Sequence, residues 1–218
     1  MSVDPLRLAI ALVPVAAYAL VLALVNARRR PFLTSGGSDL AALGVAISGL
    51  MFVGPLELFR PDAATREFGN YIWLFLLSLY WLGLVLVLLL ARPRLVIYNT
   101  SSEELRPVLA ETAGRLDPEA RWAGNHLTLP RLDVHLHLDS LEIMRNVSLV
   151  SSGSQQNIDG WRRLARELRR SLATVRTRRS PRVIALLVIS LALLAVSVTQ
   201  MLNRPEATLQ AMNEVFAY

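Results

Sequence analysis

The sequence contains no cysteine and no lysine, and all 23 of its basic residues are arginine. Without cysteine there is no disulfide, no thiol nucleophile and no thiolate ligand for zinc or an iron–sulfur cluster. Without lysine there is no Schiff-base enzyme, no pyridoxal-phosphate site and no P-loop. Missing cysteines leave the redox compartment open. Arginine in place of every lysine, with abundant alanine and leucine, is typical of GC-rich coding and suggests a bacterial protein.

Charge is scarce as well: 18% of the 218 residues are charged and 53% are hydrophobic, whereas soluble domains are about a quarter charged. A bilayer core of roughly 30 Å requires about 20 apolar residues in a helix, and four stretches meet this requirement. The sequence therefore predicts a membrane domain over residues 1–91 with three transmembrane helices (about 6–27, 39–58 and 70–91), a fourth helix over 181–203 and a tail over 204–218.

The first two stretches each allow an alternative. The first one resembles a secretory signal peptide with a cleavage site at residues 25–27, but such peptides carry positive charge before a shorter apolar core. Here Asp4 offsets Arg7, and the basic run Arg28–Arg30 follows the core, which favours a retained helix. The second stretch is short and rich in glycine, so a buried helix of a soluble fold is its alternative.

The distribution of arginine predicts the orientation in the membrane. Beside the four stretches, nine arginines lie on one side and four on the other. Since positive residues collect in cytoplasmic loops, the first loop and the long segment before the fourth helix are expected in the cytoplasm. The protein is thus expected to be a multi-pass protein of the bacterial cytoplasmic (inner) membrane, with both termini extracytoplasmic.

The sequence predicts a small cytoplasmic α+β domain over residues 92–180, inserted between the third and fourth transmembrane helices. Ser101 and Glu104 have the spacing of a capping box at the start of a helix. Helices on one face of an antiparallel sheet would bury its core. The predicted strands cover 94–98, 120–123, 126–129, 132–138 and 146–151, and the predicted helices cover 102–116 and 158–176.

All three histidines fall in two neighbouring predicted strands. A turn of two or four residues around Pro130 and Arg131 is expected to pair Thr128 with Asp133 and His126 with His135. Strand alternation then places the polar side chains on one face, where zinc accepts imidazole and carboxylate ligands. The candidate metal ligands are His126, His135, His137 and Asp133; the simpler interpretation is a solvated polar face without metal.

The last predicted helix of the domain is strongly basic. Residues 161–182 hold nine arginines and a single acid, whereas 92–160 hold seven arginines and nine acids. At about 100° per residue, six arginines fall within an arc of roughly 140°, opposite an apolar stripe. The candidate lipid- or partner-binding residues are Arg162, Arg163, Arg166, Arg169, Arg170 and Arg176; the alternative is a merely solvated face that serves as an orientation signal.

No catalytic motif occurs in the sequence, and no cofactor is expected. The leading hypothesis is a non-enzymatic interaction or scaffold protein whose cytoplasmic domain docks an unknown protein partner or the anionic headgroups of the lipid bilayer. Nucleic acid is not expected, because the membrane restricts access and no recognition motif accompanies the arginines. The alternatives are a metal-binding sensor or metal-dependent enzyme using the histidines, and a small transporter or channel subunit.

Overall fold

The computed structural model describes residues 5–56, 69, 71–141, 145–153, 156–177, 182–206 and 208–209. The chain divides into two compact units. Unit 1 comprises Met1–Ala23, Ala41–Leu90 and Ile184–Tyr218, and unit 2 comprises Leu24–Leu40 and Ala91–Val183. The loop between the second and third predicted spans, and most of the predicted tail, lie outside the described residues.

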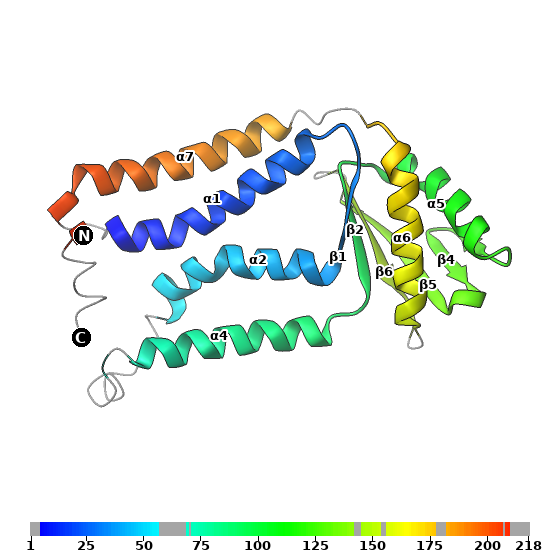
Figure 1. The fold of residues 1–218 in the computed structure, drawn as a ribbon, viewed down its shortest axis with the longest axis horizontal. Coiled ribbons are helices and arrows are strands. Elements are labelled where there is room, and N and C mark those ends of the chain that lie inside the picture. Colours follow the sequence, from blue (N-terminus) through cyan, green and yellow to red (C-terminus); the bar gives the residue numbers. More distant parts are fainter. Residues whose placement is uncertain are drawn as a thin grey trace. The chain divides into compact units, whose positions relative to one another are not determined.

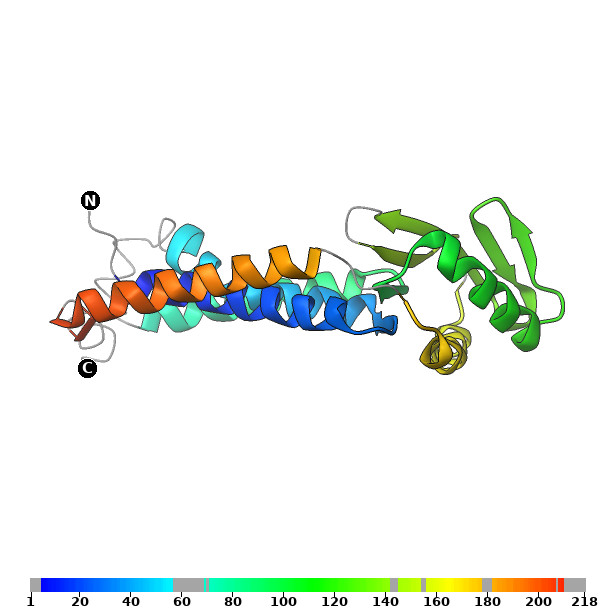
Figure 2. The same cartoon turned by 90° about the horizontal axis from the view of Figure 1, so that it is seen from above.

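Four helices in the described residues are long and apolar enough to cross a membrane, in agreement with the four predicted stretches. They are α1 (Pro5–Ala27), α2 (Gly36–Met51) with its continuation to Gly54, α4 (Tyr71–Leu90) and α7 (Arg182–Asn203). A short π-helical turn, η1 (Phe52–Leu56), extends α2. Within unit 1 the helices lie side by side with roughly aligned axes and alternating chain directions (Figures 1 and 2). Large apolar side chains such as Leu74 and Leu89 are exposed on α4, as expected of a surface that faces lipid.

Small residues allow the helices of unit 1 to approach closely. A Cβ atom on Gly49 would overlap the carbonyl oxygen of Ile10, and one on Gly44 would lie 2.6 Å from the side chain of Leu84. The hydroxyl of Tyr80 donates a 2.6 Å hydrogen bond to the carbonyl of Gly44. The Oγ of Ser190 on α7 donates to the carbonyl of Ala16 on α1 at 2.9 Å. Close contacts at small residues are typical of packed apolar helices.

Unit 2 contains a six-stranded antiparallel sheet with the order β1-β2-β6-β5-β4-β3. The strands are β1 (Phe32–Ser35), β2 (Arg94–Tyr98), β3 (Arg121–Ala123), β4 (His126–Leu129), β5 (Val134–Leu141) and β6 (Asn146–Ser151). The helices are α5 (Ser102–Leu116) and α6 (Ile158–Thr174). The predicted bounds of β2, β4, β6 and α5 are confirmed, because alternation, turn residues and a capping box mark them locally.

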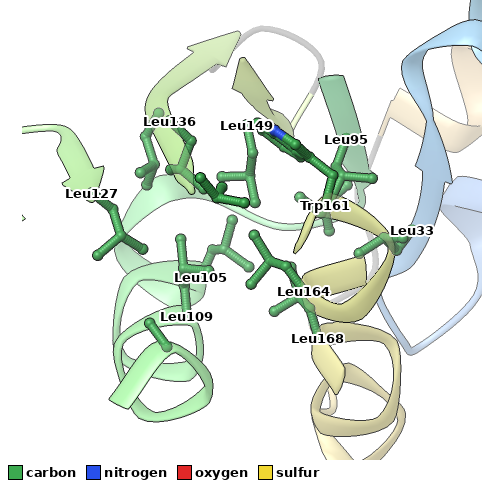
Figure 3. Close-up of a cluster of buried hydrophobic side chains, with 14 of the residues drawn as sticks. Leu33, Leu95, Leu105, Leu109, Leu127, Leu136, Leu149, Trp161, Leu164 and Leu168 are labelled. Carbon is green, nitrogen blue, oxygen red and sulfur yellow. The ribbon is translucent and has the colours of Figure 1, made fainter. Parts of the chain in front are cut away.

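Both helices pack on one face of the sheet (Figure 3). Leu105 and Leu109 of α5 and Leu164 and Leu168 of α6 are fully buried against strand residues such as Leu149. The predicted layering of helices on one sheet face is therefore confirmed. The strand register explains this layering. Residues paired across neighbouring strands, such as Leu95 with Leu149 and Leu127 with Leu136, point to the same face of the sheet.

Strand β1 was not predicted, and it lies outside the predicted domain boundaries of 92–180. It comes from the loop between α1 and α2 and pairs with β2 at the edge of the sheet, Leu33 opposite Ile97. Leu33 is only 5% exposed and belongs to the same core as α5 and α6. The connection between the first two apolar helices is thus part of the small domain.

Two further predictions about unit 2 are corrected. The predicted strand 132–138 starts only at Val134, because Pro130–Leu132 forms a 3-10 turn, η2, and Asp133 follows it with φ 48°. The predicted helix 158–176 ends at Thr174, with Val175 as its C-cap in extended conformation. Near η2, α6 approaches so closely that a Cβ on Gly160 would overlap the carbonyl oxygen of Leu132.

Candidate functional site

The predicted division of α6 into two faces is present in the structure. Trp161, Leu164, Leu168 and Leu172 are buried toward the sheet. All six candidate arginines are exposed: Arg162, Arg163, Arg166, Arg169, Arg170 and Arg176. Arg176 lies beyond the end of the helix, so five of the six stand on α6 itself. The apolar stripe of the helix is already used by the core, and the arginines face outward.

Two of these arginines are neutralised along the helix. Arg162 pairs with Asp159 at 3.2 Å and Arg170 pairs with Glu167 at 2.8 Å. Both pairs are solvent-exposed and separated by three residues, so each contributes only a few tenths of a kcal/mol. Arg163, Arg166 and Arg176 have no ion pair within the part of the chain that the structure describes. The face therefore retains a surplus of positive charge that is open to solvent.

A second group of arginines, Arg28–Arg30, joins Arg169 in unit 2. One Nη of Arg169 donates a 3.5 Å hydrogen bond to the carbonyl of Leu33 in β1, which brings the α6 side chain beside the segment that precedes β1. From the sequence alone, Arg28–Arg30 served only to favour a retained first helix and to orient the chain in the membrane. No local pattern reveals this cluster, because it depends on the unpredicted pairing of β1 with β2.

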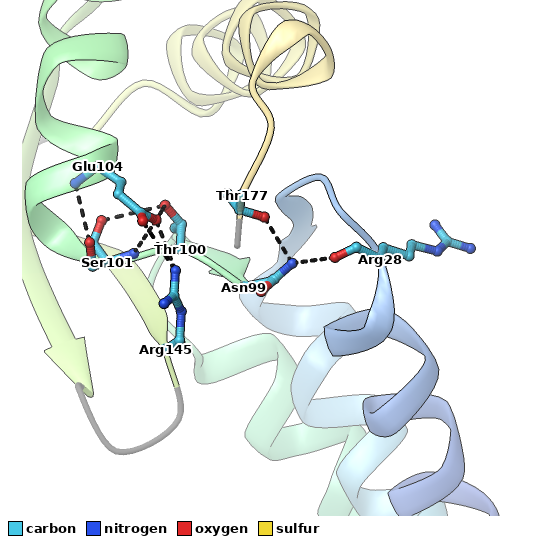
Figure 4. Close-up of polar contacts among 7 residues, drawn as sticks. All are labelled: Arg28, Asn99, Thr100, Ser101, Glu104, Arg145 and Thr177. Carbon is cyan, nitrogen blue, oxygen red and sulfur yellow. Dashed lines mark hydrogen bonds and ion pairs between the residues drawn. The ribbon is translucent and has the colours of Figure 1, made fainter. Parts of the chain in front are cut away.

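Buried polar groups fix the backbone of this segment (Figure 4). The Nδ2 of Asn99, a residue with no exposed surface, donates to the carbonyl of Arg28 at 2.6 Å and to the Oγ1 of Thr177 at 3.0 Å. The backbone N–H of Thr177 in turn donates to the carbonyl of Arg29 at 3.0 Å. Asn99 has φ 61°, a left-handed conformation that asparagine tolerates better than most residues. The arginine side chains thus project from an anchored backbone.

The histidines lie on the sheet face opposite the helices, but in a different register from the predicted one. His126 pairs with His137 and Thr128 pairs with His135. The rings of His126 and His137 are 4.5 Å apart between centroids, and the Nδ1 of His135 lies 3.4 Å from the Oγ1 of Thr128. The predicted pairings of His126 with His135 and of Thr128 with Asp133 are wrong, because η2 lengthens the connection between the strands.

Asp133 does not join the histidines in the ladder, since it caps η2 outside β5. Among the described residues, no group of three or more histidine or acidic side chains converges in a geometry that could hold a metal ion. Structural zinc sites use four ligands and catalytic sites three. The neighbouring pair His126 and His137 supplies two imidazoles, and no third ligand joins them among the described residues.

No family model matches the sequence, and comparisons with curated proteins and with solved structures give no match either. The exposed surfaces of unit 2 are therefore the remaining guide to function. Their chemistry is that of exposed guanidinium groups, which bind phosphate and carboxylate through paired N–H donors.

Proposed function

We propose that this chain is a non-enzymatic, multi-pass protein of the bacterial cytoplasmic membrane whose small α+β domain docks onto the anionic inner leaflet through the arginine face of α6. The four apolar helices support the membrane location. The bias of arginine toward the first loop and the 92–182 segment supports the orientation, with the domain in the cytoplasm and both termini outside.

The observation that carries the proposal is the one-sided charge of α6. Its apolar stripe is buried, while Arg163 and Arg166 are exposed and lack an acidic partner in the described residues. Each arginine near an anionic leaflet contributes about 1 kcal/mol, and the attraction decays within a Debye length. Three or four such residues together favour the docked domain by roughly a hundredfold to a thousandfold at physiological salt.

The test uses the full chain in lipid nanodiscs and exploits the absence of cysteine. Spin labels are attached to Ile158→Cys and, separately, to Thr174→Cys; the two positions are exposed and mark the ends of α6, about 24 Å apart along the axis. If α6 lies along the leaflet, both labels report contact with headgroups in phosphatidylglycerol nanodiscs. The Ile158→Cys label should leave the surface in phosphatidylcholine nanodiscs or when salt is raised to 1 M.

Arginine-to-glutamine variants distinguish docking through α6 from a general effect of the positive charge of unit 2. The triple variant Arg162→Gln, Arg163→Gln, Arg166→Gln should release the Ile158→Cys label in phosphatidylglycerol nanodiscs. The matched control removes three arginines from elsewhere in unit 2, Arg106, Arg121 and Arg131, and should leave the label in place. Equal headgroup contact in neutral and anionic nanodiscs, or release by the control alone, would refute docking through α6.

A further inference from the structure

The anchored segment Arg28–Arg30 and the C-terminal part of α6 enclose a groove of about 710 Å³. Four arginines line it, and no acidic residue does: the lining residues are Arg28, Arg29, Arg30, Pro31, Phe32, Leu33, Thr34, Arg169, Leu172 and Ala173. The lining is therefore cationic and apolar, with no acid to offset its charge. Arg163 and Arg166, which carry the docking proposal, do not line this groove.

The arginines of the groove have no anionic partner within the described part of the chain. This contrasts with Arg162 and Arg170 on the same helix as Arg169, each of which has an acid three residues away. The guanidinium of Arg28 lies 5.8 Å from the centre of the Phe32 ring, a cation–π distance. Repulsion among the guanidinium groups that line one groove would be relieved by a bound anion.

The site is pre-organised for such an anion. The carbonyls of Arg28 and Arg29 are held by Asn99 and Thr177, so ligand binding need not order the backbone. Figure 4 shows that the Arg28 side chain extends away from these contacts. A fixed backbone lowers the entropy lost on binding, and guanidinium forks match the oxygens of a phosphate.

We propose that this groove binds the headgroup phosphate of one anionic phospholipid. Arg28 directly follows the last residue of α1, Ala27, so the chain itself keeps the arginines within a few residues of the membrane-spanning segment. Pro31 and Leu172 provide the apolar wall that the glycerol and upper acyl region of a lipid would contact. The inference rests on the proposed membrane location but not on docking through α6.

The experiment measures lipid retention by the full-length protein in detergent, using native mass spectrometry. The probes are phosphatidylglycerol, phosphatidylcholine and inorganic phosphate, each titrated alone. The wild-type protein should retain one phosphatidylglycerol per chain. Phosphatidylcholine should bind at least about tenfold more weakly, because its choline group meets the arginines. Inorganic phosphate at equal concentration should not displace the lipid.

The variant Arg29→Gln, Arg30→Gln should weaken retention of phosphatidylglycerol by about 25-fold, taking roughly fivefold for each arginine. The matched control, Arg163→Gln with Arg166→Gln, also removes two charges but should change retention by less than about twofold. Thiol labelling of a buried Val147→Cys in each background confirms that the domain stays folded.

Three results would overturn the inference: equal retention by the Arg29→Gln, Arg30→Gln variant, an equal loss in the control, or displacement of the lipid by inorganic phosphate. The first two would show that no discrete site exists, and the third would assign the groove to a free phosphate. Failure here leaves the α6 docking test untouched, because that test uses other arginines and another readout.

Discussion

Removing the side chain of Leu33 tests whether the α1–α2 connection is a structural part of the small domain. Leu33 is 5% exposed and contacts the core that α5 and α6 form on the sheet. A buried leucine truncated to alanine loses its transfer free energy and leaves a cavity, which together cost about 2–5 kcal/mol. Since whole domains are stable by about 5–15 kcal/mol, Leu33→Ala should bring the domain much closer to unfolding.

Because the chain has no cysteine, a single Val147→Cys gives a probe of opening without background. Val147 has no exposed surface and is paired with Ile97 of β2. Ile97 is in turn paired with Leu33 of β1. Under conditions where closing is faster than labelling, the labelling rate follows the opening equilibrium. A cost of 2–5 kcal/mol then corresponds to a rate about 30- to 5,000-fold higher in the Leu33→Ala background.

The matched control is Phe32→Ala in the same strand. Phe32 is larger but 37% exposed and is outside the buried core, so its removal should raise the labelling rate by less than about tenfold. If Leu33→Ala and Phe32→Ala labelled Val147→Cys at the same rate, the assignment of β1 to the core would be wrong.

A soluble fragment of residues 92–180 lacks β1 and exposes the edge of β2, so it should self-associate in size-exclusion chromatography. Fusing the β1 segment back should restore a monomer, and a fragment that is monomeric without β1 would contradict this expectation. Gly160→Ala should lower the midpoint of thermal unfolding because its Cβ meets a backbone carbonyl, whereas Gly114→Ala, which meets nothing within 4 Å in α5, should stabilise the domain by about 0.5–1 kcal/mol. A reporter fused after Tyr218 should read as extracytoplasmic, and a cytoplasmic signal would refute the proposed orientation. Elemental analysis of protein purified without chelator should find no stoichiometric zinc, and one metal per chain that is lost in His135→Ala would refute that expectation.

Sequence reasoning succeeded where the signal is local. The apolar runs give α1, α4 and α7, and the capping box at Ser101 is present as predicted, with Ser101 Oγ accepting from the N–H of Glu104 at 3.2 Å and Glu104 accepting from the N–H of Ser101 at 3.3 Å. In α6 the spacing of leucines and arginines predicted the buried and exposed faces. Each of these patterns is complete within one element, so it can be read before the fold is known.

The failures have one physical cause, which is pairing between distant residues. Strand β1 is four residues long, between an arginine run and two glycines, and only its pairing with β2 stabilises it as a strand. The histidine register depended on the length of the connection at η2, where Asp133 adopts φ 48°. A shift of the pairing by two residues kept the histidines on one face but exchanged their partners. The groove at Arg169 could not be predicted for the same reason, because it forms only when β1 is paired with β2.

For the proposed membrane protein, the pairing of β1 with β2 also constrains how the chain would insert. Phe32 lies opposite Tyr98, and at 5–20 residues per second the ribosome makes the second strand several seconds after the first. Two apolar helices, α2 and α4, are synthesised between them. In the proposed topology, if one of the two failed to insert, the two strands would be on opposite sides of the bilayer. Closure of the sheet would therefore report that both helices have inserted, and a chain in which only one has inserted would leave the core of the small domain incomplete.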